Sequence, residues 1–222
     1  MRDLIVLLTG ADEAAFLGQI LARANRAPVI RHAPDLPSVE AALAEPAGRR
    51  RLIAFSTGVI VPGRLLERFD AGAFNFHPGT PDYPGNQVAA FAAYDGVSLF
   101  GATCHRMIAR VDAGEIVAVA RKAMAPGASR TDYAIHAYQA MAELFIEMAP
   151  KLAGFDAEIP ATGDLWSGPV RRISDIEAMR WLPRDIDRNE FSRRVRAFED
   201  GEPGSLRMNL HGWRFRIVPE ES

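Results

Sequence analysis

The fold of this chain is decided by residues 51–79, RLIAFSTGVIVPGRLLERFDAGAFNFHPG. RLIAFS (51–56) and AFNFH (73–77) are short apolar runs typical of buried strands, and the segment after Pro62 has the spacing of a helix. A strand, a helix and a second strand in this order predict a parallel βαβ unit. Pro78 ends the second strand, because proline cannot continue a central strand.

The same alternation extends toward the N-terminus. The further expected strands are LIVLLT (4–9) and PVIRH (28–32), and the further expected helices cover residues 12–24 and 38–45. Asp12 and Ser38 are the expected N-caps of these helices. A βαβαβαβ order predicts an α/β fold with a doubly wound, mainly parallel sheet of the Rossmann-like kind.

The pattern changes after the fourth strand. Residues 77–85, HPGTPDYPG, are a loop rich in proline and glycine, and a helix is expected at about 87–94. Two strand-like segments follow at 97–109 and 115–123. A long helix is then expected over 130–152, capped by Ser129 or Thr131.

The remaining residues predict a small extension. Residues 1–153 form the expected main domain and 154–169 read as a linker. Residues 170–222 contain an expected helix at 187–198 and a hairpin of SLRMNL (205–210) and WRFRIV (213–218). Fifty residues bury little core alone, so we expect the extension to pack on the main domain or on a second subunit. The exposed edge of the hairpin makes a homodimer a hypothesis.

Composition narrows the functional classes. The 222 residues carry a net charge of -2 and are 48% hydrophobic, which gives no strong field for nucleic acid. Cys104 is the only cysteine, so neither a disulfide nor a cysteine-rich zinc site is expected, and no histidine spacing indicates a metal. No secretory signal or membrane-spanning run is evident, so a cytoplasmic location is the expectation.

Three residues could carry chemistry. Asn75 and His77 lie two apart at a strand end, so both side chains point to one face, at the edge where α/β sheets bind ligands. Asp112 lies in the turn-like ARVDAGEIV segment. A structural histidine and an ordinary turn aspartate are the alternatives. Thr103 and His105 share a strand face and either line the site or pack in the core.

Residues 51–150 resemble the folate-dependent formyltransferases, which include methionyl-tRNA formyltransferase and the sugar N-formyltransferases. The matching motifs are Asn75-Phe76-His77-Pro78, Tyr83-Pro84-Gly85, Gly101-Ala102-Thr103 and Asp112-Ala113-Gly114. One departure is that Gly79-Thr80-Pro81 replaces the serine and two leucines that commonly follow His-Pro. Because this loop lies beside the substrate in the family, the departure leaves the amine acceptor open.

The resemblance implies transfer of a formyl group from 10-formyltetrahydrofolate to a primary amine, without a metal. It implies that Asn75 and a protonated His77 stabilise the oxyanion, and that Asp112 accepts the amine proton. It places the pterin against Gly58-Val59-Ile60 and Arg110-Val111. Gly79, Tyr83 and Gly85 are the expected substrate-binding residues.

The tail suggests the acceptor. Arg196-Ala197, Pro203-Gly204 and the hairpin resemble the start of the C-terminal region of the methionyl-tRNA and sugar formyltransferases. Because a basic face for tRNA is missing, we expect a small amine, an amino sugar on a nucleotide. Two alternatives stay open, a formyltetrahydrofolate hydrolase and a non-catalytic folate- or nucleotide-binding module.

Overall fold

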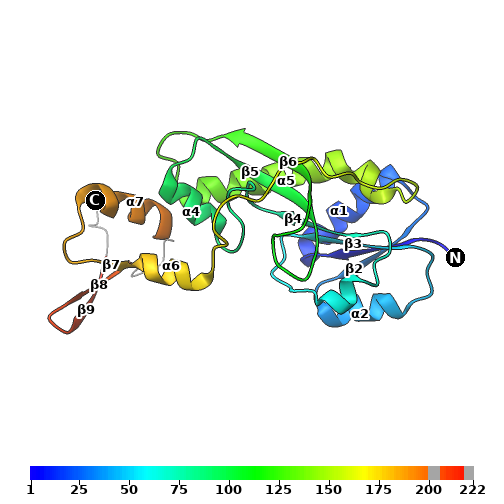
Figure 1. The fold of residues 1–222 in the computed structure, drawn as a ribbon, viewed down its shortest axis with the longest axis horizontal. Coiled ribbons are helices and arrows are strands. Elements are labelled where there is room, and N and C mark those ends of the chain that lie inside the picture. The colour runs from blue at the N-terminus through cyan, green and yellow to red at the C-terminus, as the bar shows by residue number, and fades with distance from the viewer. Residues whose placement is uncertain (200–205, 218–222) are drawn as a thin grey trace.

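A six-stranded sheet forms the centre of the protein (Figure 1). The computed structural model describes residues 1–199 and 206–217. The strands are β1 (Leu4–Leu8), β2 (Val29–Ala33), β3 (Arg50–Phe55), β4 (Ala73–His77), β5 (Leu99–Arg106) and β6 (Ile116–Ala123). Their order is β2-β1-β3-β4-β5-β6, with β2, β1, β3 and β4 parallel and β5 and β6 antiparallel to their neighbours. This confirms the predicted mainly parallel α/β sheet.

Helices cover both faces of the sheet, as expected of a doubly wound fold. Helices α1 (Ala11–Ala24) and α5 (Arg130–Ala153) lie on one face, and α2 (Leu36–Ala44) and α3 (Gly63–Leu66) lie on the other. Alternate residues of β1 point to opposite faces, so Ile5 and Leu7 pack with α1 and α5, whereas Val6 packs with α2 and α3. Burial on both faces explains why the strand is continuously apolar.

The helix starts differ from the expected caps in two cases. Helix α1 is capped by Gly10, with Asp12 in its first turn, so the expected Asp12 cap is wrong. Helix α2 is capped by Asp35, whose carboxylate accepts a hydrogen bond from the Ser38 N–H at 2.9 Å, so the expected Ser38 cap is also wrong. Ser129 caps α5 in a capping box with Asp132.

The C-terminal part of the chain packs against helix α4 (Val88–Asp95). It consists of α6 (Ile173–Arg180), β7 (Trp181–Leu182), α7 (Arg188–Phe198), β8 (Arg207–Leu210) and β9 (Trp213–Arg216). Phe198 of α7 packs edge-on against Phe91 of α4, with ring centroids 5.5 Å apart. The sequence analysis expected α7 and the β8–β9 hairpin but not α6 or β7. Figure 1 shows this part at the end of the molecule away from the N-terminus.

Three parts of the chain complete the description. Residues 154–170 contain no helix or strand. Pro203-Gly204 of the tail motif, like Ser205 and Val218 at the ends of the expected hairpin, lie outside the described residues. Within 1–199 and 206–217, no helix has the length and apolar character needed to cross a membrane.

Candidate active site

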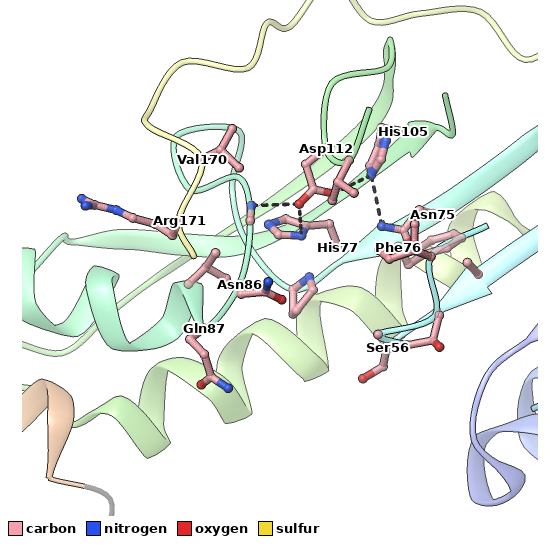
Figure 2. Close-up of a pocket in the computed structure, with 18 of the residues that line it drawn as sticks. Ser56, Asn75, Phe76, His77, Asn86, Gln87, His105, Asp112, Val170 and Arg171 are labelled. Atoms are coloured by element: carbon pink, nitrogen blue, oxygen red, sulfur yellow. Dashed lines mark hydrogen bonds and ion pairs between the residues drawn. The ribbon is translucent and has the colours of Figure 1, made fainter. Parts of the chain in front are cut away.

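A cavity of about 840 Å³ opens at the end of β3 and β4 (Figure 2). Besides residues of β3, β4, β5 and α5, four connecting stretches of the chain form its walls. They are the loop after β3 (residues 56–61), the loop and first turn of α4 (85–89), the loop after β5 (107–112) and the segment 170–173. The volume is in the range typical of sites for small organic ligands. Asn75, His77, His105 and Asp112 all line it.

Asn75 and His105 meet because β4 and β5 run antiparallel. The two residues are direct partners in the strand register. The Asn75 Nδ2 atom lies 3.1 Å from His105 Nε2, and His105 Nδ1 donates to the Arg106 carbonyl at 2.8 Å. The Asn75 amide carries two hydrogens, and a contact with His105 engages only one of them, which leaves the second for another acceptor.

Asp112 returns to these strands through a tight loop. The φ of Asp112 is 43°, a left-handed conformation that aspartate tolerates better than most residues. Gly114 lets the loop close, because a Cβ there would lie 1.9 Å from the Arg106 carbonyl oxygen. The Asp112 carboxylate consequently reaches both histidines, with Oδ1 3.3 Å from His105 Nε2 and Oδ2 3.4 Å from His77 Nδ1. Figure 2 shows this arrangement.

The Asp112 carboxylate is buried but held in its charged form. Only 6% of the residue is exposed, and burial acts to raise its pKa. The contact with His105, the nearby His77 and a 2.8 Å hydrogen bond from the Gly85 N–H outweigh burial and lower the pKa below its usual value. Asp112 is therefore ionised at neutral pH and can accept a proton.

His77 is also almost completely buried. Burial lowers the pKa of His77, although the Asp112 carboxylate and the Tyr83 carbonyl act in the opposite direction. The Nε2 proton is donated to the Tyr83 carbonyl at 2.7 Å. Burial is the largest of these effects, so the pKa of His77 lies below its usual value. The protonated His77 expected from the sequence, which would donate to both Tyr83 and Asp112, stays a prediction.

Two of the three expected substrate-binding residues do not line the cavity. The Gly79 carbonyl accepts a 2.7 Å hydrogen bond from the Thr103 hydroxyl behind the loop. The Tyr83 hydroxyl donates to Asp95 at 2.8 Å, with its ring against Phe100. Both residues support the loop from the protein side, because the loop after Pro78 folds inward. Gly85 does line the cavity and presents its N–H to Asp112.

All five residues expected to hold a cofactor line the cavity. They are Gly58, Val59, Ile60, Arg110 and Val111. Ile60 and Val111 leave large apolar side chains exposed, at 61% and 46%. Such exposed apolar side chains beside a cavity provide contact area for a flat ring system.

The sequence analysis missed two contributions to the site. The sequence alone does not decide whether His105 lines the site or packs in the core, because its contact with Asn75 depends on the β4–β5 register. Trp166 was placed in a linker, yet its ring packs edge-on against His77 and His105, with centroids 5.6 Å and 5.1 Å apart. The lone tryptophan in a polar stretch was the available signal. Across the part of the chain that the structure describes, no group of histidine, cysteine, aspartate and glutamate residues forms a metal site.

Comparisons with known proteins show a family match for part of the chain and similar folds for the whole. Residues 51–148 match the family model described as formyl transferase, and these residues include Asn75, His77, His105 and Asp112. The fold is similar to that of a sugar N-formyltransferase from Shewanella sp. FDAARGOS_354, with a TM-score of 0.79 and 15% identity over 98% of this chain and 96% of that one.

Two further structures share the fold. One is a 4-N formyltransferase from Francisella tularensis, with a TM-score of 0.72 and 16% identity over 100% of this chain and 98% of that one. The other is the N-formyltransferase from Helicobacter canadensis in complex with folinic acid and dTDP-3-aminofucose, with a TM-score of 0.64 and 14% identity over 96% and 85%. The segment 51–148 is thus similar to the formyl transferase family, and the whole chain shares its fold with these solved structures.

Proposed function

We propose that this enzyme transfers the formyl group of 10-formyltetrahydrofolate to the primary amine of a small molecule, an amino sugar on a nucleotide. The observation that carries the proposal is the ionised Asp112 carboxylate, held between His77 and His105 beside the Asn75 amide at the wall of one cavity. This set offers a base and a hydrogen-bond donor within reach of one carbonyl group.

The reaction needs one proton to move as one C–N bond replaces another. The amine nitrogen attacks the formyl carbon, and negative charge develops on the formyl oxygen. The free hydrogen of the Asn75 amide stabilises that oxygen, with His105 fixing the amide through the other hydrogen. Asp112 accepts the amine proton directly or through water, and the proton returns to the folate nitrogen as its bond to the formyl carbon breaks.

His77 is assigned to the same oxyanion site with Asn75. Its Nε2 proton is engaged by the Tyr83 carbonyl, and its Nδ1 atom faces Asp112. In its protonated form the ring donates to the Asp112 carboxylate through Nδ1 and acts on the formyl oxygen after exchanging the Tyr83 contact. Substitution of His77 with asparagine removes both contributions and is expected to reduce turnover.

The two ends of the cavity suit the two substrates. The apolar and main-chain wall of Gly58, Val59, Ile60, Arg110 and Val111 suits the pterin ring. Asn86, Gln87 and the segment 170–173 form the wall on the acceptor side. The Helicobacter canadensis protein of similar fold, which holds folinic acid and dTDP-3-aminofucose, supports this pair of ligands.

The test is an assay of the purified protein with 10-formyltetrahydrofolate and a panel of amino-sugar nucleotides and other primary amines. Mass spectrometry should detect a product heavier than its amine by the mass of CO, together with tetrahydrofolate. Formate release in the absence of any amine would instead identify a hydrolase. Binding of folate with neither product would identify a binding module.

We also propose a homodimer in the cytoplasm that works without nucleic acid. Strand β9 is the edge of its sheet, with Trp213 73% exposed and Phe215 48% exposed. An open edge with apolar side chains can pair with a second copy. Cys104 is free and buried, which suits a reducing compartment. Light scattering should give twice the chain mass, and a monomer at every concentration would refute the dimer.

A further inference from the structure

We infer that Trp166 is a positioning residue that holds the imidazoles of His77 and His105 in their working orientation. The inference rests on the proposed function of the site and adds a residue from outside the matched formyl transferase segment. Trp166 is not part of the cavity wall, so it reaches the histidines without occupying substrate space.

The indole has one contact with each part of the site. Its ring meets His77 at an interplanar angle of 77° and His105 at 84°, both in edge-to-face geometry. Its Nε1–H donates to the Gly114 carbonyl at 2.9 Å. Because Gly114 ends the loop that carries Asp112, one side chain connects both histidines with the base.

The segment around Trp166 is firmly attached to the active-site loop. The Ser167 N–H donates to the Pro81 carbonyl at 3.1 Å, and the Ser167 hydroxyl donates to Asp82 at 2.8 Å. A Cβ on Gly168 would lie 1.8 Å from the Asp82 carbonyl oxygen, so the two backbones approach as closely as glycine permits. We call residues 166–171 the strap.

The far end of the strap meets the residue that binds Asp112. The Arg171 N–H donates to the Pro84 carbonyl at 2.9 Å, and the Arg171 carbonyl accepts from the Asn86 N–H at 2.8 Å. Gly85 lies between these contacts, where a Cβ would be 2.2 Å from the Arg171 carbonyl oxygen. The strap therefore fixes the backbone whose N–H holds the Asp112 carboxylate.

These contacts give Trp166 a role beyond filling space. His77 and His105 are 4% and 3% exposed, and the indole is one of the groups that cover them. Removing it leaves both rings free to turn and lets water approach the buried Asp112. A misplacement of about 1 Å in such a site is enough to lower the rate on the order of 100-fold.

The test compares three variants of the full-length chain. Trp166→Ala removes the ring, Trp166→Phe keeps an aromatic edge but loses the N–H, and Leu165→Ala changes a neighbour that is 80% exposed. We expect Trp166→Ala to lower kcat by about 30- to 100-fold with KM values for both substrates within about threefold. Trp166→Phe should recover most of the rate, and Leu165→Ala should match the parent.

A second readout does not depend on turnover. In proteins with 15N-labelled histidine, Trp166→Ala should move the imidazole resonances of His77 and His105, and Leu165→Ala should leave them in place. If Trp166→Ala does not fold, Trp166→Phe and Trp166→Leu provide the same contrast. If the parent formylates no amine while these resonances move, the proposed function fails and the positioning contact stands.

The inference is overturned by either of two results. One is a folded Trp166→Ala protein with parental kcat and unshifted His77 and His105 resonances. The other is a loss of kcat/KM that comes from higher KM values for both substrates. That pattern indicates a collapsed cavity instead of misoriented histidines.

Discussion

The parallel and antiparallel halves of the sheet contribute differently to the cavity. From parallel strand β3 and the loop after it, the cavity receives mainly main chain and aliphatic groups, with the hydroxyls of Ser56 and Thr57. From the junction of β4 with the antiparallel strand β5, it receives Asn75, His77, His105 and, after β5, Asp112. These four polar side chains are concentrated where the strand direction changes from parallel to antiparallel.

Strand direction explains the difference. Parallel neighbours end at the same edge of a sheet, so they bring loops together. Antiparallel neighbours place side chains within the strands directly opposite each other, as Asn75 and His105 are. The loop after β5 then has only a short distance to return Asp112 to the same point. Strands β2, β1 and β3 therefore provide a platform, and the junction of β4 with β5 provides these polar side chains of the cavity.

The substitution with the largest expected effect on kcat is Asp112→Asn, at the antiparallel end of the site. Asparagine tolerates the left-handed backbone at this position, where φ is 43°, and preserves the side-chain shape, so only the charge is lost. We expect kcat to fall about 1,000-fold, because the base that accepts the amine proton is removed. Steady-state rates with the identified amine measure this. A fall of less than tenfold would show that the base lies elsewhere.

The next effect is that of Asn75→Ala. Loss of one oxyanion donor lowers kcat by about 100- to 1,000-fold in comparable sites. The KM for the folate should change little, since its expected wall lies on the other loops. Asn75→Asp is the matched variant, since it keeps the side-chain size but places an acceptor where the donor is needed, and it should be equally slow. A fast Asn75→Asp enzyme would exclude the oxyanion role.

The parallel half is tested by Arg51→Met in β3. The buried Arg51 guanidinium donates to the carbonyls of Leu152 and Gly154 at 2.6 Å each and to Ala71 at 2.9 Å. Its loss should lower the free energy of unfolding by about 3 kcal/mol, because buried carbonyls lose their partners. Urea unfolding measures this, and kcat at low temperature should match the parent. A large change in kcat would contradict the division between the halves.

The smallest expected effect is a pH dependence of stability. The pKa of His77 in the folded protein lies below its usual value of 6.5, so the unfolded chain takes up this proton first. The contribution of His77 is therefore complete above about pH 6.5 and is lost as the pH falls toward the lowered value. Asp112 adds a similar loss only in the more acidic range, since its pKa is below 3.8.

Urea unfolding at about pH 7.5 and about pH 5.5 measures this dependence in the parent and in His77→Gln. The parent should lose more stability between the two conditions than the variant, which has no proton to take up at position 77. Equal losses in both proteins would show that His77 is not buried in its neutral form.

Much of the fold and the cavity followed from local sequence patterns, whereas the remaining contacts depend on tertiary structure. The apolar runs placed the four parallel strands, and the strand end of Asn75 and His77 indicated the binding edge. His105 could not be assigned, because its contact with Asn75 requires the antiparallel register. Tyr83 carries its side chain into the protein, which no spacing of the loop reveals. Trp166 lies 89 residues after His77, and its place depends on contacts of the whole strap.

The close approach of the strap to the loop has a consequence for building hybrid enzymes. A graft that replaces the C-terminal part of this chain with that of a protein of similar fold would separate Gly168 and Arg171 from Asp82 and Gly85, which fit them without room for a Cβ. The junction of such a hybrid should therefore lie before the strap. The loop at 80–86 must then come from the same protein as the C-terminal part. The loop at 80–86 and the C-terminal part of the chain therefore cannot be exchanged as independent modules.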